Sequence, residues 1–126
     1  MQLSLKGKVV AITGGSEGIG GATATRVAEL GATVAICARR AEVMEVKAAE
    51  CRKLGVEVLT VVADAAKAGD MERFVEETVK RFGRIDVLVN NAGGTGQAAF
   101  DKVTDKEFAH DIEIKVMAQV RTARAA

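Results

Sequence analysis

The run Thr13-Gly-Gly-Ser-Glu-Gly-Ile-Gly20 has the residue types and the spacing of a phosphate-binding turn. It lies between an apolar run, 8–13, and a segment with helical periodicity, so its glycines would open a helix. A helix N-terminus presents free backbone N–H groups and a partial positive charge, and both attract a pyrophosphate. We expect Gly14 to make the turn, Gly18 to admit the phosphates and Gly20 to pack the helix on the strand. The alternative is an ordinary glycine-rich turn.

Two arginines, Arg39 and Arg40, follow the second apolar run, 33–38. An NAD site places an acid at about this point, roughly 20 residues after the glycines, to bind the ribose 2′-OH. A guanidinium group instead binds a 2′-phosphate through paired, charge-assisted hydrogen bonds. The two arginines therefore indicate NADP in preference to NAD. The alternative is a pair of solvated charges, although arginines at a helix N-terminus oppose the helix dipole.

A literal G-x-G-x-x-A match also occurs, at residues 94–99. The sequence continues as a polar loop to residue 103, and a capping box, Thr104 to Glu107, then begins a helix. No helix opens at these glycines, so we interpret the match as a flexible loop beside the site.

Alternating strands and helices must position these motifs. Apolar runs predict strands at 8–13, 33–38, 56–63 and 85–89. Helical spacing predicts helices at about 20–31, 41–54, 70–82 (with Asp70 as N-cap) and from 108 onward. Strands joined by helical crossovers run parallel, with helices on both faces. The predicted fold class is therefore α/β, a Rossmann-type doubly wound parallel sheet.

The composition excludes several classes of function. The chain has 126 residues, a net charge of +1, four Phe and no Trp or Tyr. It therefore offers neither a basic stripe nor stacking platforms for nucleic acid. No apolar stretch approaches the ~18 residues of a membrane span, and no secretory signal is recognisable.

The remaining reactive side chains do not form a metal or redox site. Cys37 and Cys51 form no CxxC pair, which favours buried thiols and a reducing, cytoplasmic location. His110 is the single histidine, and we interpret it as a solvated helix residue. The carboxylates of Asp101, Asp105 and Glu107 are interpreted as capping and solvated groups. We therefore expect no metal.

Three motifs in order resemble the short-chain dehydrogenase/reductase family. They are Thr13-Gly-x-x-x-Gly-Ile-Gly20, Asp64 after the third strand, and Asn90-Asn-Ala-Gly93 after the fourth. The resemblance covers essentially the whole chain. It implies NADP-dependent interconversion of a carbonyl and an alcohol, on a sheet with strand order 3-2-1-4.

The resemblance also implies a role for each motif residue. The residues that would line the pyrophosphate and the adenosine ribose are Gly14, Ser16, Gly18, Ile19 and Gly20. Those that would hold the 2′-phosphate and the adenine are Arg39, Arg40, Asp64 and Ala65. Those that would lie along the nicotinamide-side ribose are Asn91, Ala92 and Gly93, with Asn90 bracing the sheet. Turn formation is the alternative role for Asp64 and the two asparagines.

The chain departs from the family at its catalytic residues. The family uses Ser, Tyr and Lys, with an Asn on the helix after the fourth strand. Glu113 occupies that Asn position, and Lys115 follows Asp111 where the Tyr-x-x-x-Lys pattern needs Tyr. The Ser, Tyr and Lys would lie beyond residue 126.

The last residues, 121–126, lie inside a helical pattern without a cap, which indicates a polypeptide that continues. We therefore expect residues 1–126 to be an incomplete NAD(P)-binding domain, inactive alone, from a homo-oligomeric oxidoreductase that acts on a small carbonyl or alcohol. The alternatives are a non-catalytic nucleotide-binding or interaction module and a fragment that folds poorly. The apolar strand edge at 87–89 is protected from strand pairing only by Asp86, and a dedicated small module would protect it better. This favours the incomplete domain of a longer oxidoreductase over the module.

Overall fold

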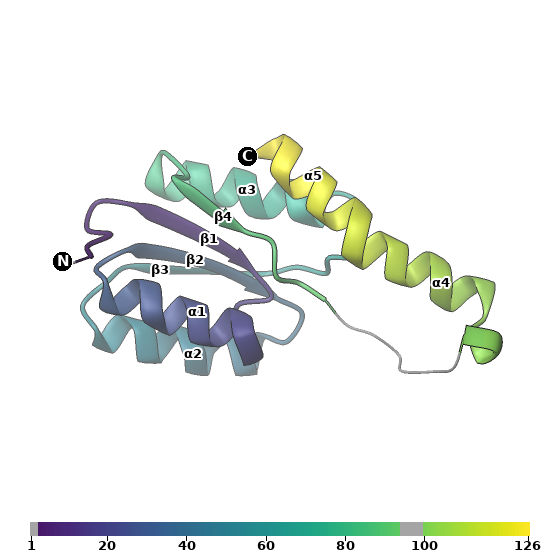
Figure 1. Cartoon of the computed structure of the whole chain (residues 1–126). Helices are drawn as coiled ribbons and strands as arrows, with labels where there is room; N and C mark the ends of the chain where they lie inside the picture. The colour runs from purple at the N-terminus through teal and green to yellow at the C-terminus, as the bar shows by residue number, and fades with distance from the viewer. Residues whose placement is uncertain (1–2, 94–99) are drawn as a thin grey trace.

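Strands and helices alternate along the chain (Figure 1). The computed structural model describes residues 3–93 and 100–126. The strands are β1 (Val9–Thr13), β2 (Thr33–Ala38), β3 (Val58–Val62) and β4 (Val87–Val89). The α-helices are α1 (Gly18–Glu29), α2 (Ala41–Lys53), α3 (Asp70–Phe82), α4 (Asp105–Ile112) and α5 (Ala118–Ala125). A 3-10 turn (Phe100–Lys102) precedes α4, and a π-helical segment (Glu113–Met117) joins α4 to α5.

The strands form one parallel sheet in the order β3-β2-β1-β4, which confirms the predicted fold class and strand order. All four strands point the same way, so their carboxyl ends meet at one edge. The chain winds outward from β1 in one direction to β2 and β3, and then crosses back to place β4 on the other side of β1. Ligands of open α/β sheets bind at the carboxyl edge beside such a reversal.

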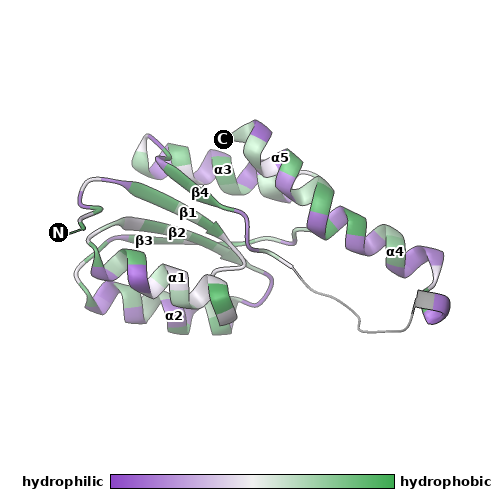
Figure 2. Ribbon diagram, viewed as in Figure 1, coloured by the Kyte–Doolittle hydropathy of each residue, from purple (hydrophilic) through white to green (hydrophobic). Residues whose placement is uncertain are grey.

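Helices cover both faces of the sheet, so the strands are apolar along their length (Figures 1 and 2). Val10 and Ile12 belong to the core that packs against α1 and α2. Ala11 and Cys37 belong to the core that packs against α3 and α5. Neighbouring residues of β1 thus face opposite layers, as the two-residue period of a strand requires.

The N-terminus of α3 differs from its prediction. Asp70 is not the N-cap: that position is held by Gly69, whose φ of +90° is left-handed, and no side chain within 3–93 and 100–126 caps the helix. The Asp70 carboxylate instead accepts a hydrogen bond from the backbone N–H of Asp64, at 2.8 Å. The capping box before α4 is confirmed, because Thr104 and Glu107 each accept from the other's backbone N–H, at 3.2 and 3.1 Å.

The sequence predicts one continuous last helix, but the structure has a π-helical segment after α4. Three residues spaced four apart, Ile114, Ala118 and Thr122, are buried along this stretch. A regular α-helix would rotate such a row out of line, because its period is 3.6 residues. The widened turn is consistent with keeping this row on one face, against α3.

Asp86 does not blunt the outer edge of β4, contrary to the sequence-based prediction. Its Oδ2 accepts a hydrogen bond from the backbone N–H of Val9 at 2.8 Å, and its own N–H donates to the Val9 carbonyl at 2.9 Å. The carboxylate is therefore turned inward to β1. Within the described residues, the other side of β4 has no strand partner.

Candidate functional site

A cavity of about 430 Å³ lies at the carboxyl edge of the sheet and is lined by turns that follow all four strands. Its predicted lining residues are Gly14, Ser16, Ile19, Arg39, Arg40, Asp64, Ala65, Asn91, Ala92 and Gly93. The lining residues that the sequence did not assign to the cofactor site are Glu17, Cys37, Ala38, Ala63, Met71 and Ile114. Of the predicted residues, only Gly18 and Gly20 do not line it.

The glycine-rich turn adopts a backbone that other residues rarely reach. Gly14 and Gly18 have φ values of +68° and +60°. The N–H groups of Gly14 and Gly15 donate to the Cys37 carbonyl at 2.9 and 3.3 Å, which fixes the turn to β2. A Cβ on Gly18 would meet no atom of the described residues within 4 Å, so this position needs glycine for its conformation and leaves space above it in that part of the structure.

Gly20 has a packing role instead. A Cβ there would lie 2.2 Å from the Gly14 carbonyl oxygen and 2.3 Å from Nδ2 of Asn91. The prediction that Gly20 packs α1 onto the strand is consistent with these distances. Gly15, which the sequence did not single out, is equally constrained, because its Cβ would lie 2.5 Å from Cγ2 of Ile36. That constraint depends on the register of β1 and β2, which no local pattern encodes.

Thr13 joins the turns after β1 and β4. Its buried Oγ1 accepts hydrogen bonds from the backbone N–H groups of Asn91 and Ala92, both at 3.0 Å. The Asn91 side chain donates from Nδ2 to the Gly14 carbonyl at 3.1 Å. The resemblance implies a bracing role for Asn90, and in the structure the Asn91 side chain makes a contact of this kind between the two turns.

The N-terminus of α1 opens into the cavity without a side-chain cap. Glu17 is the N-cap residue, yet its carboxylate makes no capping hydrogen bond. The first backbone N–H groups of a helix lack intrahelical acceptors, so they can bind an anion. Next to them, Ile19 is 80% exposed and lines the cavity. A polar cradle beside an exposed apolar side chain suits a ligand with both phosphate and ring surfaces.

Three charged side chains stand at the β2 side of the cavity. Arg40 forms an ion pair with Glu17, with Nη2 and Oε1 2.9 Å apart. Arg39 is exposed at the cavity wall and makes no hydrogen bond or ion pair within residues 3–93 and 100–126. Arg39 is thus available to an external anion, whereas Arg40 already has a carboxylate partner.

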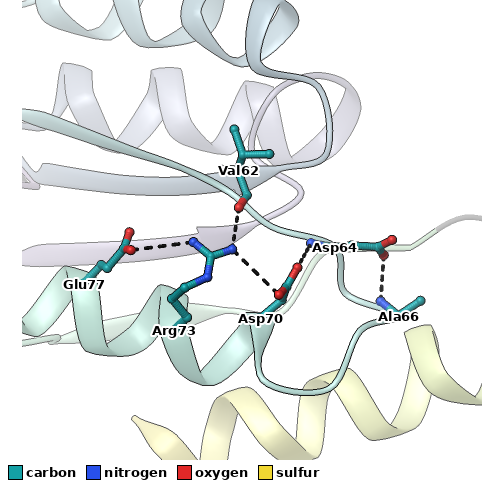
Figure 3. A network of polar contacts seen from close by, with 6 residues as sticks. All are labelled: Val62, Asp64, Ala66, Asp70, Arg73 and Glu77. Atoms are coloured by element: carbon teal, nitrogen blue, oxygen red, sulfur yellow. Dashed lines mark hydrogen bonds and ion pairs between the residues drawn. The ribbon is translucent and has the colours of Figure 1, made fainter.

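A polar network holds the turn after β3 (Figure 3). The Asp64 carboxylate accepts from the Ala66 N–H at 2.9 Å, and Asp70 fixes the Asp64 backbone. Arg73 donates to the Val62 carbonyl at 2.6 Å and lies 3.8 Å from the Asp70 carboxylate. The turn-forming role considered for Asp64 is therefore real, and α3 positions this wall of the cavity.

Glu113 is engaged along its own helix. Its carboxylate pairs with Arg121 at 2.7 Å, and the Arg121 side chain is only 16% exposed. The adjacent residue, Ile114, is buried and lines the cavity. Glu113, which is predicted to stand at the family's Asn position, therefore has a salt-bridge partner, and the apolar Ile114 lines the cavity beside it.

Cys37 lines the cavity, but its thiol is not activated as a nucleophile. Burial raises the pKa of its thiol to about 12, against a lowering by the Gly14 hydrogen bond. The thiol is therefore neutral near pH 7, and a neutral thiol is a poor nucleophile. The described residues contain no group of three or more His, Cys, Asp or Glu arranged to hold a metal, and no helix in them is long and apolar enough to cross a membrane.

Comparison with known proteins agrees with this geometry. A family model for short chain dehydrogenases matches residues 8–126. The chain is 50% identical over 90 residues to 11-beta-hydroxysteroid dehydrogenase-like 4A of Arabidopsis thaliana, covering 71% of this chain and 30% of that protein.

Solved structures extend the likeness to nearly the whole chain. A short chain dehydrogenase from Burkholderia cenocepacia in complex with NADP aligns with a TM-score of 0.94 and 35% identity, covering 97% of this chain and 50% of that one. An NADH-dependent reductase responsible for alginate metabolism aligns with a TM-score of 0.88, 33% identity and the same coverages. The chain thus spans about a third to a half of the proteins it matches.

Proposed function

The chain belongs to the short-chain dehydrogenase family, and from that premise we propose that it forms the cofactor-binding part of an NADP-dependent oxidoreductase. The proposed reaction is hydride transfer between the cofactor and a small carbonyl or alcohol. The observation that carries the proposal is the α1 N-terminus without a side-chain cap, in one cavity with Arg39, which has no hydrogen-bond or ion-pair partner among the residues that the structure describes.

The fit between cavity and cofactor rests on three features. Open space above Gly18 and the uncapped α1 N-terminus suit a pyrophosphate. Exposed Ile19 suits apolar ring or ribose surface. Arg39 suits a 2′-phosphate, because a guanidinium group offers several N–H donors in one plane. Asp64 and Ala65 would border the adenine, and Asn91, Ala92 and Gly93 the second ribose.

The bound cofactor would supply the hydride, and a proton donor would have to complete the reaction. The chain has no tyrosine, and its single histidine lies on α4 outside the cavity lining. We therefore propose that residues 1–126 bind and orient the cofactor, and that the catalytic Ser, Tyr and Lys belong to the remainder of a longer protein. Residues 1–126 alone should not reduce a carbonyl.

Nucleotide titration tests this function directly. The reduced nicotinamide of NADPH and NADH is excited at wavelengths that protein side chains do not absorb, so its fluorescence reports binding directly. We expect NADPH to bind more tightly than NADH, and pure protein to leave NADPH unoxidised in the presence of carbonyl compounds. Equal affinities would contradict the NADP assignment. Steady oxidation of NADPH above a blank would contradict the proposal that the catalytic residues lie outside residues 1–126.

We also propose that the longer protein is a homo-oligomer. Three apolar residues on the outer side of the last helices, Ile112, Val116 and Val120, are 48%, 51% and 45% exposed. They alternate with the buried row that packs against α3, so they point away from the sheet. Light scattering should show a smaller average mass for Val116→Lys than for the parent. Identical masses would contradict a role for these three residues in self-association.

A further inference from the structure

We propose that the Glu17–Arg40 ion pair tunes the cofactor preference of the cavity by opposing a 2′-phosphate. This inference rests on the proposed nucleotide site and assigns within it a residue that restrains binding. Both side chains line the cavity, and both are 66% exposed. The pair therefore stands at the mouth of the site, where an entering ligand meets it.

The Glu17 carboxylate binds the Arg40 side chain and not the backbone N–H groups at the start of α1. An acid at a helix N-terminus ordinarily caps the first N–H groups or benefits from their dipole. Glu17 makes no capping hydrogen bond and reaches across 23 positions of sequence to Arg40. Its charge is thereby held on the β2 side of the cavity, beside the two arginines.

The charge count follows from this arrangement. Arg39 and Arg40 together offer two positive charges, and the Glu17 carboxylate cancels one of them at 2.9 Å. A 2′-phosphate would have to displace the Glu17 carboxylate from Arg40, or bind Arg39 alone with the negative charge of Glu17 nearby. A ribose 2′-OH is neutral and carries no such penalty. Glu17 should therefore weaken NADP binding and leave NAD binding nearly unchanged.

The test uses two ligands that differ only in the relevant phosphate. Isothermal titration with adenosine 2′,5′-bisphosphate and adenosine 5′-phosphate isolates the 2′-phosphate contribution. We expect Glu17→Gln to tighten binding of the bisphosphate by about three- to tenfold relative to the monophosphate, since tenfold is what about 1.4 kcal/mol provides. Arg40→Gln should weaken bisphosphate binding, and the Glu17→Gln gain should shrink in the double variant.

A matched control removes the same charge elsewhere on α1. Glu29 pairs with Arg26 at the far end of that helix and does not line the cavity. Glu29→Gln should leave the ratio of the two affinities unchanged. An equal gain in Glu29→Gln would show a net-charge effect and overturn the proposal. So would an unchanged ratio in Glu17→Gln.

Failure of the proposed function has a different signature. If neither ligand binds any variant, the nucleotide site itself is wrong. If both ligands bind but Arg39→Met does not weaken bisphosphate binding, the assignment of the 2′-phosphate to Arg39 is wrong. If Arg39→Met weakens the bisphosphate and Glu17→Gln has no effect, the site stands and only the role of Glu17 is wrong. Circular dichroism should show all variants folded, because exposed ion pairs contribute little stability.

Discussion

The side-chain amide of Asn91 donates a hydrogen bond of 3.1 Å to the Gly14 carbonyl, and this contact joins two turns 77 positions apart in sequence. The α1 helix packs directly against it, since a Cβ on Gly20 would overlap both partners. The glycine-rich turn is thus supported from β4 as well as from its own strand. The shape of the cavity floor depends on three chain segments at once.

Gly20→Ala should therefore destabilise the protein and weaken nucleotide binding together. The new methyl group would lie 2.2 Å from the Gly14 carbonyl oxygen, so the helix or the turn must move. Overpacking of this kind costs about 1–3 kcal/mol. Urea denaturation measures the stability loss, and NADPH titration the loss of affinity.

Gly21→Ala is the matched control on the next residue. Its Cβ would lie 3.2 Å from Lys47 Cε, the flexible end of a side chain, and 3.3 Å from the Ser16 backbone. Helix propensity favours Ala over Gly by about 1 kcal/mol, which offsets the closer contact. We expect stability near that of the parent; an equal loss in both variants would contradict the packing role of Gly20.

Thr13→Val should destabilise the turn after β4 without changing side-chain shape. The hydroxyl is the acceptor for the N–H groups of Asn91 and Ala92, and valine leaves both without it. Leaving buried donors unpaired costs about 1–3 kcal/mol. Thr13→Ser keeps the acceptor and should retain most of the stability in urea denaturation. If Ser and Val variants lose equal stability, the hydroxyl is not the cause.

Asp70→Ala should weaken binding of adenosine 5′-phosphate, because Asp70 fixes the Asp64 backbone at the cavity wall. Glu77→Ala is the control, since Glu77 also lies beside Arg73, at 3.6 Å, but does not contact Asp64. We expect a several-fold loss for Asp70→Ala, on the order of 1 kcal/mol, and little change for Glu77→Ala. Calorimetric titration measures both, and equal losses would refute the positioning role.

Acid should weaken the junction of β1 and β4. A hydrogen bond from Arg84, and then one from the Val9 N–H, lower the pKa of the Asp86 carboxyl below its ordinary value. The stability that this carboxylate contributes is therefore present above the unfolded pKa of about 3.9 and is lost as pH falls through the lower folded pKa.

Asp86→Asn should accordingly be less stable than the parent at pH 7, and the difference should narrow at acid pH. Urea midpoints measured across that range check this. The exposed Asp101→Asn is the control and should follow the parent throughout. A difference that stays constant with pH would contradict the assignment.

Both thiols should be unreactive in the folded protein. Burial raises the pKa of Cys51 and raises that of Cys37 to about 12. Ellman's reagent at pH 8 should detect neither thiol until urea unfolds the chain. Because both folded pKa values are raised, the stability these thiols contribute is present below the unfolded pKa of about 8.5 and is lost as pH rises through the folded values, which for Cys37 is about 12. Rapid native labelling would contradict the burial of either thiol.

The sequence alone was sufficient for the architecture and for most of the cavity lining. Apolar runs such as 33–38 and helical spacing such as that of 70–82 are local patterns, and parallel pairing follows once helices separate the strands. Glycines before a helix and arginines after a strand lie at the carboxyl edge by the same logic. These features depend only on residues near one another in the chain.

Contacts between distant segments were decided by the tertiary structure. Whether Asp70 caps α3 or binds Asp64, whether Asp86 faces solvent or Val9, and whether Arg40 is free or paired with Glu17 are choices between competing partners. Each side chain carries the same chemistry in either arrangement, so its type and spacing cannot select the partner. Strand register and helix packing bring one of the competing partners within hydrogen-bond distance, and that geometry exists only in the folded chain.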